Sequence, residues 1–212
     1  MVKIKSDNLI LHFVDVGAHT GRTSKKILQS GGDNTRVWMF EPNAILALSL
    51  IADTQGDSRA VVYAKAFTDK EGRADMYTPD KTSESSSLYA DKKTSIGSPV
   101  ISVPCIDGVA FLKKLSPGPI VLYSNCEGSE FDFIPKVLDD KELRDRIVFW
   151  SVSFHHGQRK IPSMKPTYLK IKARMDELGI ENVIGHYGNR DIREGKLDEF
   201  VKEVLTYAPK NS

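Results

Sequence analysis

The amino-acid sequence predicts an α/β fold, with a mostly parallel central sheet that carries helices on both faces. Short apolar runs rich in β-branched residues alternate along the chain with segments of helical character. Runs that are apolar throughout are typical of parallel strands, because helices bury such strands on both faces. A length of 212 residues with 40% hydrophobic content fits a single domain, residues 1–212.

The first half of the chain shows this alternation most clearly. Its expected elements are, in order, strand 9–16, helix 23–29, strand 36–40, helix 43–52, strand 60–67 and strand 73–77. Gly31 and Gly32 end the first helix, and Asn43 has the side chain of an N-cap for the second. Residues 69–72 resemble a hairpin turn, which predicts a small β-hairpin insert beside the parallel sheet.

A long polar segment, 78–99, separates the two halves and contains serines at 83, 85, 86, 87, 95 and 98. Loops of this length in compact domains are often lids or binding loops, so a lid over a ligand is expected, with a solvated connection as the alternative. The second half then predicts strand 101–106, helix 108–115 capped by Asp107, strand 120–125, helix 127–138, strand 147–154, helix 167–178, strand 182–186 and helix 196–205, with Arg190 near the start of a further strand.

Two of these strands end in residues suited to an adenosine ligand. The first leads into Asp15-x-Gly17-x-x-x-Gly21, and the second ends at Glu41. A glycine turn lets a ligand approach the backbone, and a carboxylate on the neighbouring strand can accept hydrogen bonds from two ribose hydroxyls. Asp15 would repel a pyrophosphate but suits the amino group of a methionine moiety, and the middle glycine of a dinucleotide motif is missing. This charge argument favours S-adenosyl-L-methionine over NAD.

Six short motifs in order support a family resemblance. They are VDVGAHTG at 14–21, FEPN at 40–43, AFTDKEG at 66–72, SL at 87–88, VPCID at 103–107 and CEGSE at 126–130. Together they resemble the FkbM family of class I, S-adenosylmethionine-dependent methyltransferases, most clearly over residues 8–138. The resemblance implies a Rossmann-like fold and methyl transfer to a hydroxyl of a small polar or glycan-like acceptor, such as a sugar or nucleotide-sugar.

Ligands of open α/β sheets gather at the carboxyl ends of the strands, which places the expected cofactor contacts there. The family resemblance adds Ser87 and Leu88 from the polar segment. The expected cofactor-binding residues are Asp15, Gly17, Ala18, His19, Thr20, Gly21, Glu41, Pro42, Ala66, Phe67, Asp69, Ser87, Leu88 and Asn125. Residues 65–67 would border the adenine, and Asp69 would either accept from its amino group or serve only the turn that follows.

The sequence departs from the family at Asn125, where the family has an aspartate before the Glu-Gly pair. Asparagine can hold an amino group or a hydroxyl but cannot act as a base. The expected catalytic residues are therefore His155, Glu127 and Asn125. His155 is expected to be the base, since an unperturbed histidine has a pKa near 6.5. Glu127 would orient the acceptor or the cofactor. His156 is a second candidate, and a metal site from Glu127, His155 and His156 has no supporting spacing.

Composition limits the binding partners and the alternative functions that the sequence allows. A net charge of +2 does not by itself imply nucleic acid, and no apolar run has the length of a membrane helix. Cys105 and Cys126 fit buried free thiols, hence a cytoplasmic location. The basic residues at 158–160 and along 165–174 fit either a solvated helix face or recognition of an acidic acceptor. A non-catalytic cofactor-binding protein, an NAD-dependent oxidoreductase and an RNA ribose methyltransferase are the alternatives, and the oligomeric state is open.

Overall fold

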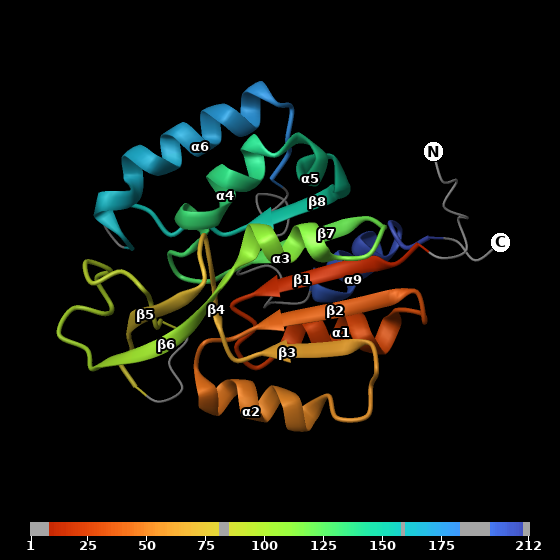
Figure 1. Ribbon diagram of the computed structural model, residues 1–212, viewed down its shortest axis with the longest axis horizontal. Coiled ribbons are helices and arrows are strands. Elements are labelled where there is room, and N and C mark those ends of the chain that lie inside the picture. The colour runs from red at the N-terminus through yellow and green to blue at the C-terminus, as the bar shows by residue number, and fades with distance from the viewer. Residues whose placement is uncertain (1–8, 81–84, 158–159, 183–195, 210–212) are drawn as a thin grey trace.

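The fold is built on a five-stranded parallel sheet with the strand order β3-β2-β1-β7-β8. The computed structural model describes residues 9–80, 85–157, 160–182 and 196–209. The strands are β1 (Leu11–Val16), β2 (Thr35–Phe40), β3 (Ala60–Tyr63), β7 (Ile120–Ser124) and β8 (Ile147–Val152). All four pairings between neighbouring strands are parallel. This confirms the predicted Rossmann-like α/β class, and Figure 1 shows the twisted sheet at the centre of the molecule.

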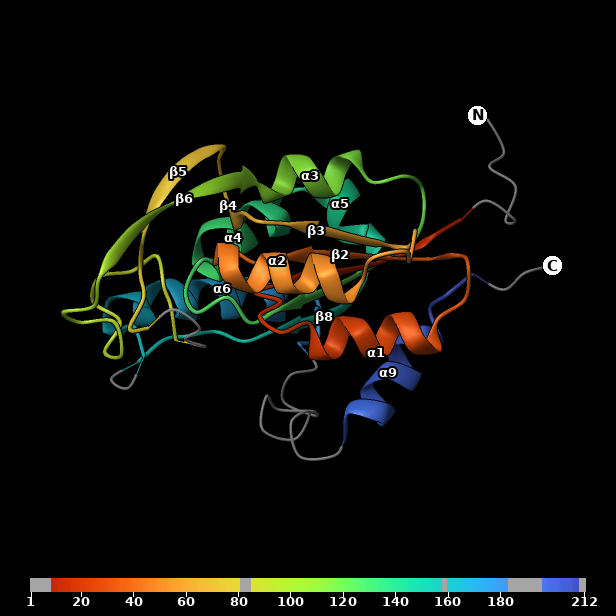
Figure 2. The same ribbon diagram turned by 90° about the horizontal axis from the view of Figure 1, so that it is seen from below.

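Helices cover both faces of the sheet, as Figure 2 shows edge-on. One face packs against α1 (Arg22–Ser30), α2 (Ala44–Asp53) and α9 (Leu197–Leu205). The other packs against α3 (Gly108–Lys114), α4 (Glu130–Asp139), α5 (Lys141–Arg146) and α6 (Lys165–Glu177), which follows the short 3-10 helix η2 (Pro162–Met164). None of the helices in the described part of the chain is long and apolar enough to cross a membrane.

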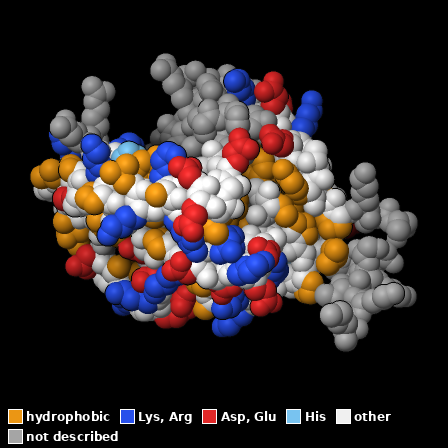
Figure 3. Space-filling view, turned by 90° about the horizontal axis from the view of Figure 1, so that it is seen from above, with side chains coloured by type: hydrophobic (Ala, Val, Ile, Leu, Met, Phe, Trp, Pro, Cys, Tyr) orange, Lys and Arg blue, Asp and Glu red, His pale blue; other side chains and the backbone are white. Residues whose placement is uncertain are grey.

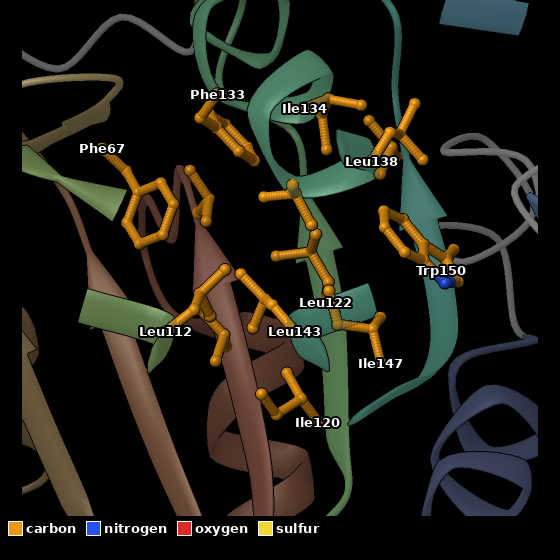
Figure 4. Packing of buried hydrophobic residues seen from close by; sticks show 14 of the residues in the cluster. Phe67, Leu112, Ile120, Leu122, Phe133, Ile134, Leu138, Leu143, Ile147 and Trp150 are labelled. Carbon is orange, nitrogen blue, oxygen red and sulfur yellow. The ribbon is translucent and has the colours of Figure 1, made fainter. Parts of the chain in front are cut away.

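The central strands are buried on both faces because helices cover both sides of the sheet. Consecutive side chains of a strand point to opposite sides and so enter different cores. In β1, Leu11 and Phe13 belong to the cluster under α1 and α9, whereas Val14 and Val16 belong to the cluster under α3 and α4. Figure 4 shows this second cluster, which contains Leu112, Leu122 and Trp150. The strand therefore contributes apolar side chains to two separate cores.

A second sheet of three strands lies beyond the carboxyl ends of the main sheet (Figure 1). Its order is β4 (Ala66–Thr68), β6 (Val100–Asp107) and β5 (Gly72–Tyr77). The predicted single strand 60–67 is wrong, because β3 pairs with β2 only as far as Tyr63 opposite Phe40, where β2 ends. Beyond that point the chain has no partner in the main sheet and continues as β4 beside β6.

The predicted hairpin between 60–67 and 73–77 is wrong for a related reason. β6 lies between β4 and β5, parallel to β4 and antiparallel to β5. The antiparallel pair is therefore β5 and β6, and the long polar segment joins them. The turn at residues 69–72 connects strands that do not pair with each other.

The helix ends follow local chemistry. The side chain of Asn43 accepts a hydrogen bond from the Ile45 amide, and that of Asp107 accepts from Ala110, so both predicted N-caps are confirmed. Helix α4 begins at Glu130 rather than 127, since Glu127 and Gly128 have φ values of 57° and 135°. Helix α5, capped by Asp140, was not expected. The predicted strand at 182–186 lies outside the described residues except for Asn182, which bridges to Trp150, and the one near Arg190 lies wholly outside.

Candidate functional site

A cavity opens at the carboxyl ends of β1, β2 and β7, where the strand order reverses direction between β1 and β7. Figure 1 shows the arrowheads of β1 and β2 pointing toward this end of the molecule. The predicted residues that line the cavity are Asp15, Gly17, Ala18, His19, Thr20, Glu41, Pro42, Ala66, Phe67, Ser87, Leu88, Asn125 and Glu127. A ligand site is expected at this switch point in an open parallel sheet.

The two glycines of the first motif have different roles. Gly17 lines the cavity with φ +85°, and a Cβ there would lie 2.5 Å from the Asn125 carbonyl oxygen. The ends of β1 and β7 can approach only because residue 17 has no side chain. Gly21, at φ +69°, starts α1, and a Cβ there would lie 2.4 Å from Leu50. It does not line the cavity, so it shapes the turn rather than contacting a ligand as predicted.

Asp15 is a buried carboxylate at the cavity wall, with only 2% of the residue exposed. Its Oδ2 accepts a hydrogen bond of 2.6 Å from the Ser24 hydroxyl. Its Oδ1 is buried and has no hydrogen-bond partner among the described residues. Burial raises the pKa of Asp15 to about 7, with the Ser24 hydrogen bond opposing this shift and Glu41 adding to it. Ser24 was missed by the sequence analysis, because only the packing of α1 brings its hydroxyl to the end of β1.

Glu41 is fixed by backbone donors on both oxygens. Its Oε2 accepts from the His19 amide at 2.9 Å, and its Oε1 accepts from the Asn43 amide at 2.9 Å. Burial raises its pKa, while these two hydrogen bonds oppose the shift. A carboxylate oxygen can accept more than one hydrogen bond, so each still has capacity toward the cavity.

An apolar wall faces these carboxylates. Phe67 and Phe40 line the cavity and pack edge to face, with ring centroids 4.7 Å apart. Gly108 supports the Phe67 ring, since a Cβ at residue 108 would lie 2.0 Å from it. Asp69 was expected to reach an adenine at this wall but does not line the cavity. Its carboxylate instead pairs with Lys136 of α4 at 2.9 Å, because β4 directs it toward that helix.

The expectation that His155 is a base disagrees with its surroundings. His155 is buried, does not line the cavity, and has both ring nitrogens on carboxylates. Its Nε2 lies 3.1 Å from Glu127 Oε1, and its Nδ1 lies 2.9 Å from Glu130 Oε1. Burial alone would lower the pKa of His155, but the two carboxylates raise it to about 9. At neutral pH the ring is an imidazolium with no lone pair for a proton.

Glu127 is the end of this buried network that reaches the cavity. Its Oε2 lies 2.8 Å from the Nζ of Lys92, whose side chain is 1% exposed. Although burial alone would raise the pKa of Glu127, His155 and Lys92 lower it to about 2. Glu130 is fully buried, and its Oε2 accepts from the Gly128 amide at 2.8 Å and from the Cys126 thiol. The motif at 126–130 is therefore a loop organised around two ionised carboxylates.

His156 lies apart from this network. Its ring stacks on Tyr168 of α6 with centroids 3.6 Å apart, and it does not line the cavity. Among the residues that the structure describes, no group of three or more His, Cys, Asp or Glu side chains could hold a metal ion.

The described residues 85–99 of the polar segment between β5 and β6 pack against the rest of the chain. Residues 85–99, called the strap below, contribute Ser86, Ser87 and Leu88 to the cavity wall. The Ser87 amide and carbonyl pair with Tyr77, the Tyr89 hydroxyl donates to Asp132 at 2.6 Å, and Lys92 is buried. These contacts favour a fixed wall over the predicted lid that orders only with ligand.

The basic residues of α6 belong to a solvated surface. Lys172 pairs with Asp176, and Arg174 pairs with Glu177, both within one turn of the helix. Figure 3 shows positive and negative side chains interspersed on the face that includes α6. Of the basic residues at 158–160, only Lys160 lies within the described chain, and its Nζ is 3.6 Å from Glu127.

Comparisons with known proteins add no relative. Neither the family models, nor the curated proteins, nor the solved structures that were searched gave a match.

Proposed function

We propose that this chain is an S-adenosyl-L-methionine-dependent O-methyltransferase of the FkbM type, acting on a hydroxyl of a small polar or glycan-like acceptor. The observation that carries this proposal is the carboxylate of Asp15, buried at the cavity wall with Oδ1 unpartnered among the described residues. A buried carboxylate oxygen without a donor is costly, and an ammonium group would satisfy both its hydrogen bonding and its charge.

The rest of the cavity fits the same ligand. Glu41 can accept from the two ribose hydroxyls, and Phe67, Phe40 and Ala66 form an apolar wall for an adenine ring. Asp15 and Glu41 line the cavity outside the ion pairs that Glu127 makes with Lys92 and His155. Their combined charge disfavours the pyrophosphate of NAD and suits a ligand that carries an ammonium and a sulfonium.

The bound cofactor would supply a methyl group on a positively charged sulfur. What the chain must do is hold an acceptor hydroxyl in line with that methyl group. Glu127 stays ionised and can accept the hydrogen bond of the acceptor hydroxyl, and Asn125 lies beside it in the cavity wall. Cys105 and Cys126 are both free, which supports a reducing, cytoplasmic setting.

A second candidate is a cofactor-binding protein without methyl transfer. Two observations favour it: Asn125 stands where the resembled family has an aspartate, and both ring nitrogens of His155 are engaged by carboxylates. An RNA ribose methyltransferase is the weaker alternative, because such enzymes commonly need an aspartate with flanking lysines at the active strands.

Calorimetry with S-adenosylmethionine and S-adenosylhomocysteine, followed by methyl transfer to a panel of sugars and nucleotide-sugars, tests the proposal. We expect both ligands to bind wild-type protein, Asp15→Asn to weaken both, and at least one hydroxylated acceptor to be methylated. Absence of binding overturns the proposal. Binding without turnover across the panel selects the second candidate.

A further inference from the structure

Four ionisable side chains of alternating charge form a continuous row beside the cavity. Lys92 Nζ lies 2.8 Å from Glu127 Oε2, and Glu127 Oε1 lies 3.1 Å from His155 Nε2. His155 Nδ1 then lies 2.9 Å from Glu130 Oε1. Glu127, at 14% side-chain exposure, is the most exposed of the four and the one that lines the cavity.

The lysine in this row comes from a different part of the chain. Lys92 belongs to the strap, whereas Glu127 follows β7. The strap holds Glu127 a second time, because the Ser87 hydroxyl donates to the Glu127 carbonyl oxygen at 2.6 Å. A fully buried lysine is rare and costly unless it is paired, so its pairing with a cavity-lining carboxylate indicates a role there.

The charges of the row cancel. With His155 protonated, Lys92 and His155 balance Glu127 and Glu130, so the cavity wall at this point carries no net charge from the row. Lys160 approaches the same oxygen of Glu127 at 3.6 Å, but its side chain is half exposed and its charge is therefore better screened. Removing the charge of Lys92 would leave only the half-exposed Lys160 beside this oxygen of Glu127, and so a poorly compensated negative charge at the cavity wall.

We infer that Lys92 is a positioning residue for Glu127, and that this ion pair sets how strongly the cavity prefers a cationic cofactor to its neutral product. This inference rests on the proposed function. S-adenosylmethionine and S-adenosylhomocysteine differ by one methyl group and one positive charge at sulfur. A charge change near that sulfur shifts their two dissociation constants by different factors, whereas a loss of packing shifts both alike.

The first test compares Lys92→Met with Lys93→Met, which removes the charge of the neighbouring exposed lysine. Calorimetry at pH 7.5 gives the ratio of the dissociation constant of S-adenosylhomocysteine to that of S-adenosylmethionine. We expect Lys92→Met to raise this ratio about three- to tenfold, as one partly screened charge does at such range. We expect Lys93→Met to leave the ratio unchanged. If Lys92→Met weakens the binding of both ligands by the same factor, the inference is overturned, because such a result indicates a structural role alone.

A second variant keeps the inference testable if Lys92→Met does not fold. Glu127→Gln leaves the charge of Lys92 uncompensated, so the same ratio should fall, and an unchanged ratio overturns the inference. Hydrogen exchange of the 126–130 amides should also rise in Lys92→Met and not in Lys93→Met. Failure of wild-type protein to bind either ligand would instead overturn the proposed function, so the two failures are distinguishable.

Discussion

The hydroxyl of Ser24 donates a hydrogen bond of 2.6 Å to Oδ2 of Asp15, and this leaves Oδ1 as the side of the carboxylate without a partner in the described structure. One residue of α1 thus fixes the orientation of a carboxylate at the end of β1. Because burial raises the pKa of Asp15 to about 7, the same carboxylate is half protonated near neutral pH. The binding of a cationic ligand should therefore be linked to the ionisation of Asp15.

Cofactor binding should release a proton near neutral pH. The ammonium group favours ionised Asp15, so binding lowers its pKa from about 7, and the affinity should increase as the pH rises from 6 to 8. Calorimetry at pH 7 in two buffers of different ionisation enthalpy measures the number of protons released. We expect about half a proton for wild-type protein and none from this group in Asp15→Asn. Release that is equal in both proteins would contradict the assignment.

Glu41 should anchor the ribose. Glu41→Ala removes the acceptor for two hydroxyls, and hydrogen bonds to charged groups are worth about 1.5–3 kcal/mol, so affinity should fall roughly 10- to 150-fold. Glu71→Ala, at an exposed carboxylate near Lys65, is the matched control and should bind normally. Because Glu41 also accepts from two backbone amides, thermal unfolding of each variant is measured alongside. A folded Glu41→Ala protein with unchanged affinity would count against the ribose site.

His155 should remain an imidazolium through neutral pH. Its folded pKa of about 9 lies above the unfolded value of 6.5, so its contribution to stability is complete below pH 6.5. That contribution is lost as the pH rises toward 9. Nitrogen-15 NMR of the ring, assigned with His155→Gln, measures the titration directly. A midpoint near 6.5 would restore His155 as a candidate base.

His12 gives the opposite pH dependence at the other end of the sheet. Its Nδ1 accepts from the Trp38 indole at 3.2 Å, its Nε2 bonds to the Ser116 carbonyl at 2.9 Å, and burial lowers its pKa to about 4. In the unfolded chain His12 binds a proton near pH 6.5, whereas in the folded chain it stays neutral down to about pH 4. The free energy of unfolding should fall by about 3 kcal/mol between pH 6.5 and 4 from this group. Urea denaturation at several pH values gives the free energy of unfolding of wild type and of His12→Asn. This free energy should change less with pH in the variant.

The strap should be ordered without ligand. The amides of Ser87 and Ser95 donate to the carbonyls of Tyr77 and Lys92 at 3.0 and 2.8 Å. Hydrogen exchange of the ligand-free protein should show both amides protected, with little further protection when S-adenosylhomocysteine is added. Rapid exchange of both amides that slows with ligand would support a lid instead.

The sequence allowed the ends of the strands to be predicted better than the network beside them. Asp15 lies near the end of β1 and Glu41 directly after β2, and the carboxyl ends of parallel strands must meet at one edge of the sheet. Lys92 carries no local signal of burial, because its partner Glu127 comes from the far side of β6, α3 and β7. The surroundings of His155 were not predicted for the same reason: its pKa depends on two carboxylates that only the folded chain brings to its ring.

The strand predicted at 60–67 shows a similar limit. Its residues have uniform strand character, but the partner in the main sheet ends at Phe40. Where a strand stops pairing is decided by the length of its neighbour, which local propensity does not encode.

The chain leaves the main sheet after Tyr63, and as a result two different parts of the chain line the cavity. The ends of β1, β2 and β7 supply the carboxylates, whereas residues 66–88 supply Ala66, Phe67, Met76, Ser86, Ser87 and Leu88. These two parts fold into different sheets, yet Phe67 packs against Phe40 of the main sheet, and Ser87 and Lys92 of the strap both bind Glu127. A change in the small sheet or in the strap therefore reaches the carboxylate side of the cavity, and an engineer who exchanges these segments as a cassette would have to carry Phe67, Ser87 and Lys92 over unchanged.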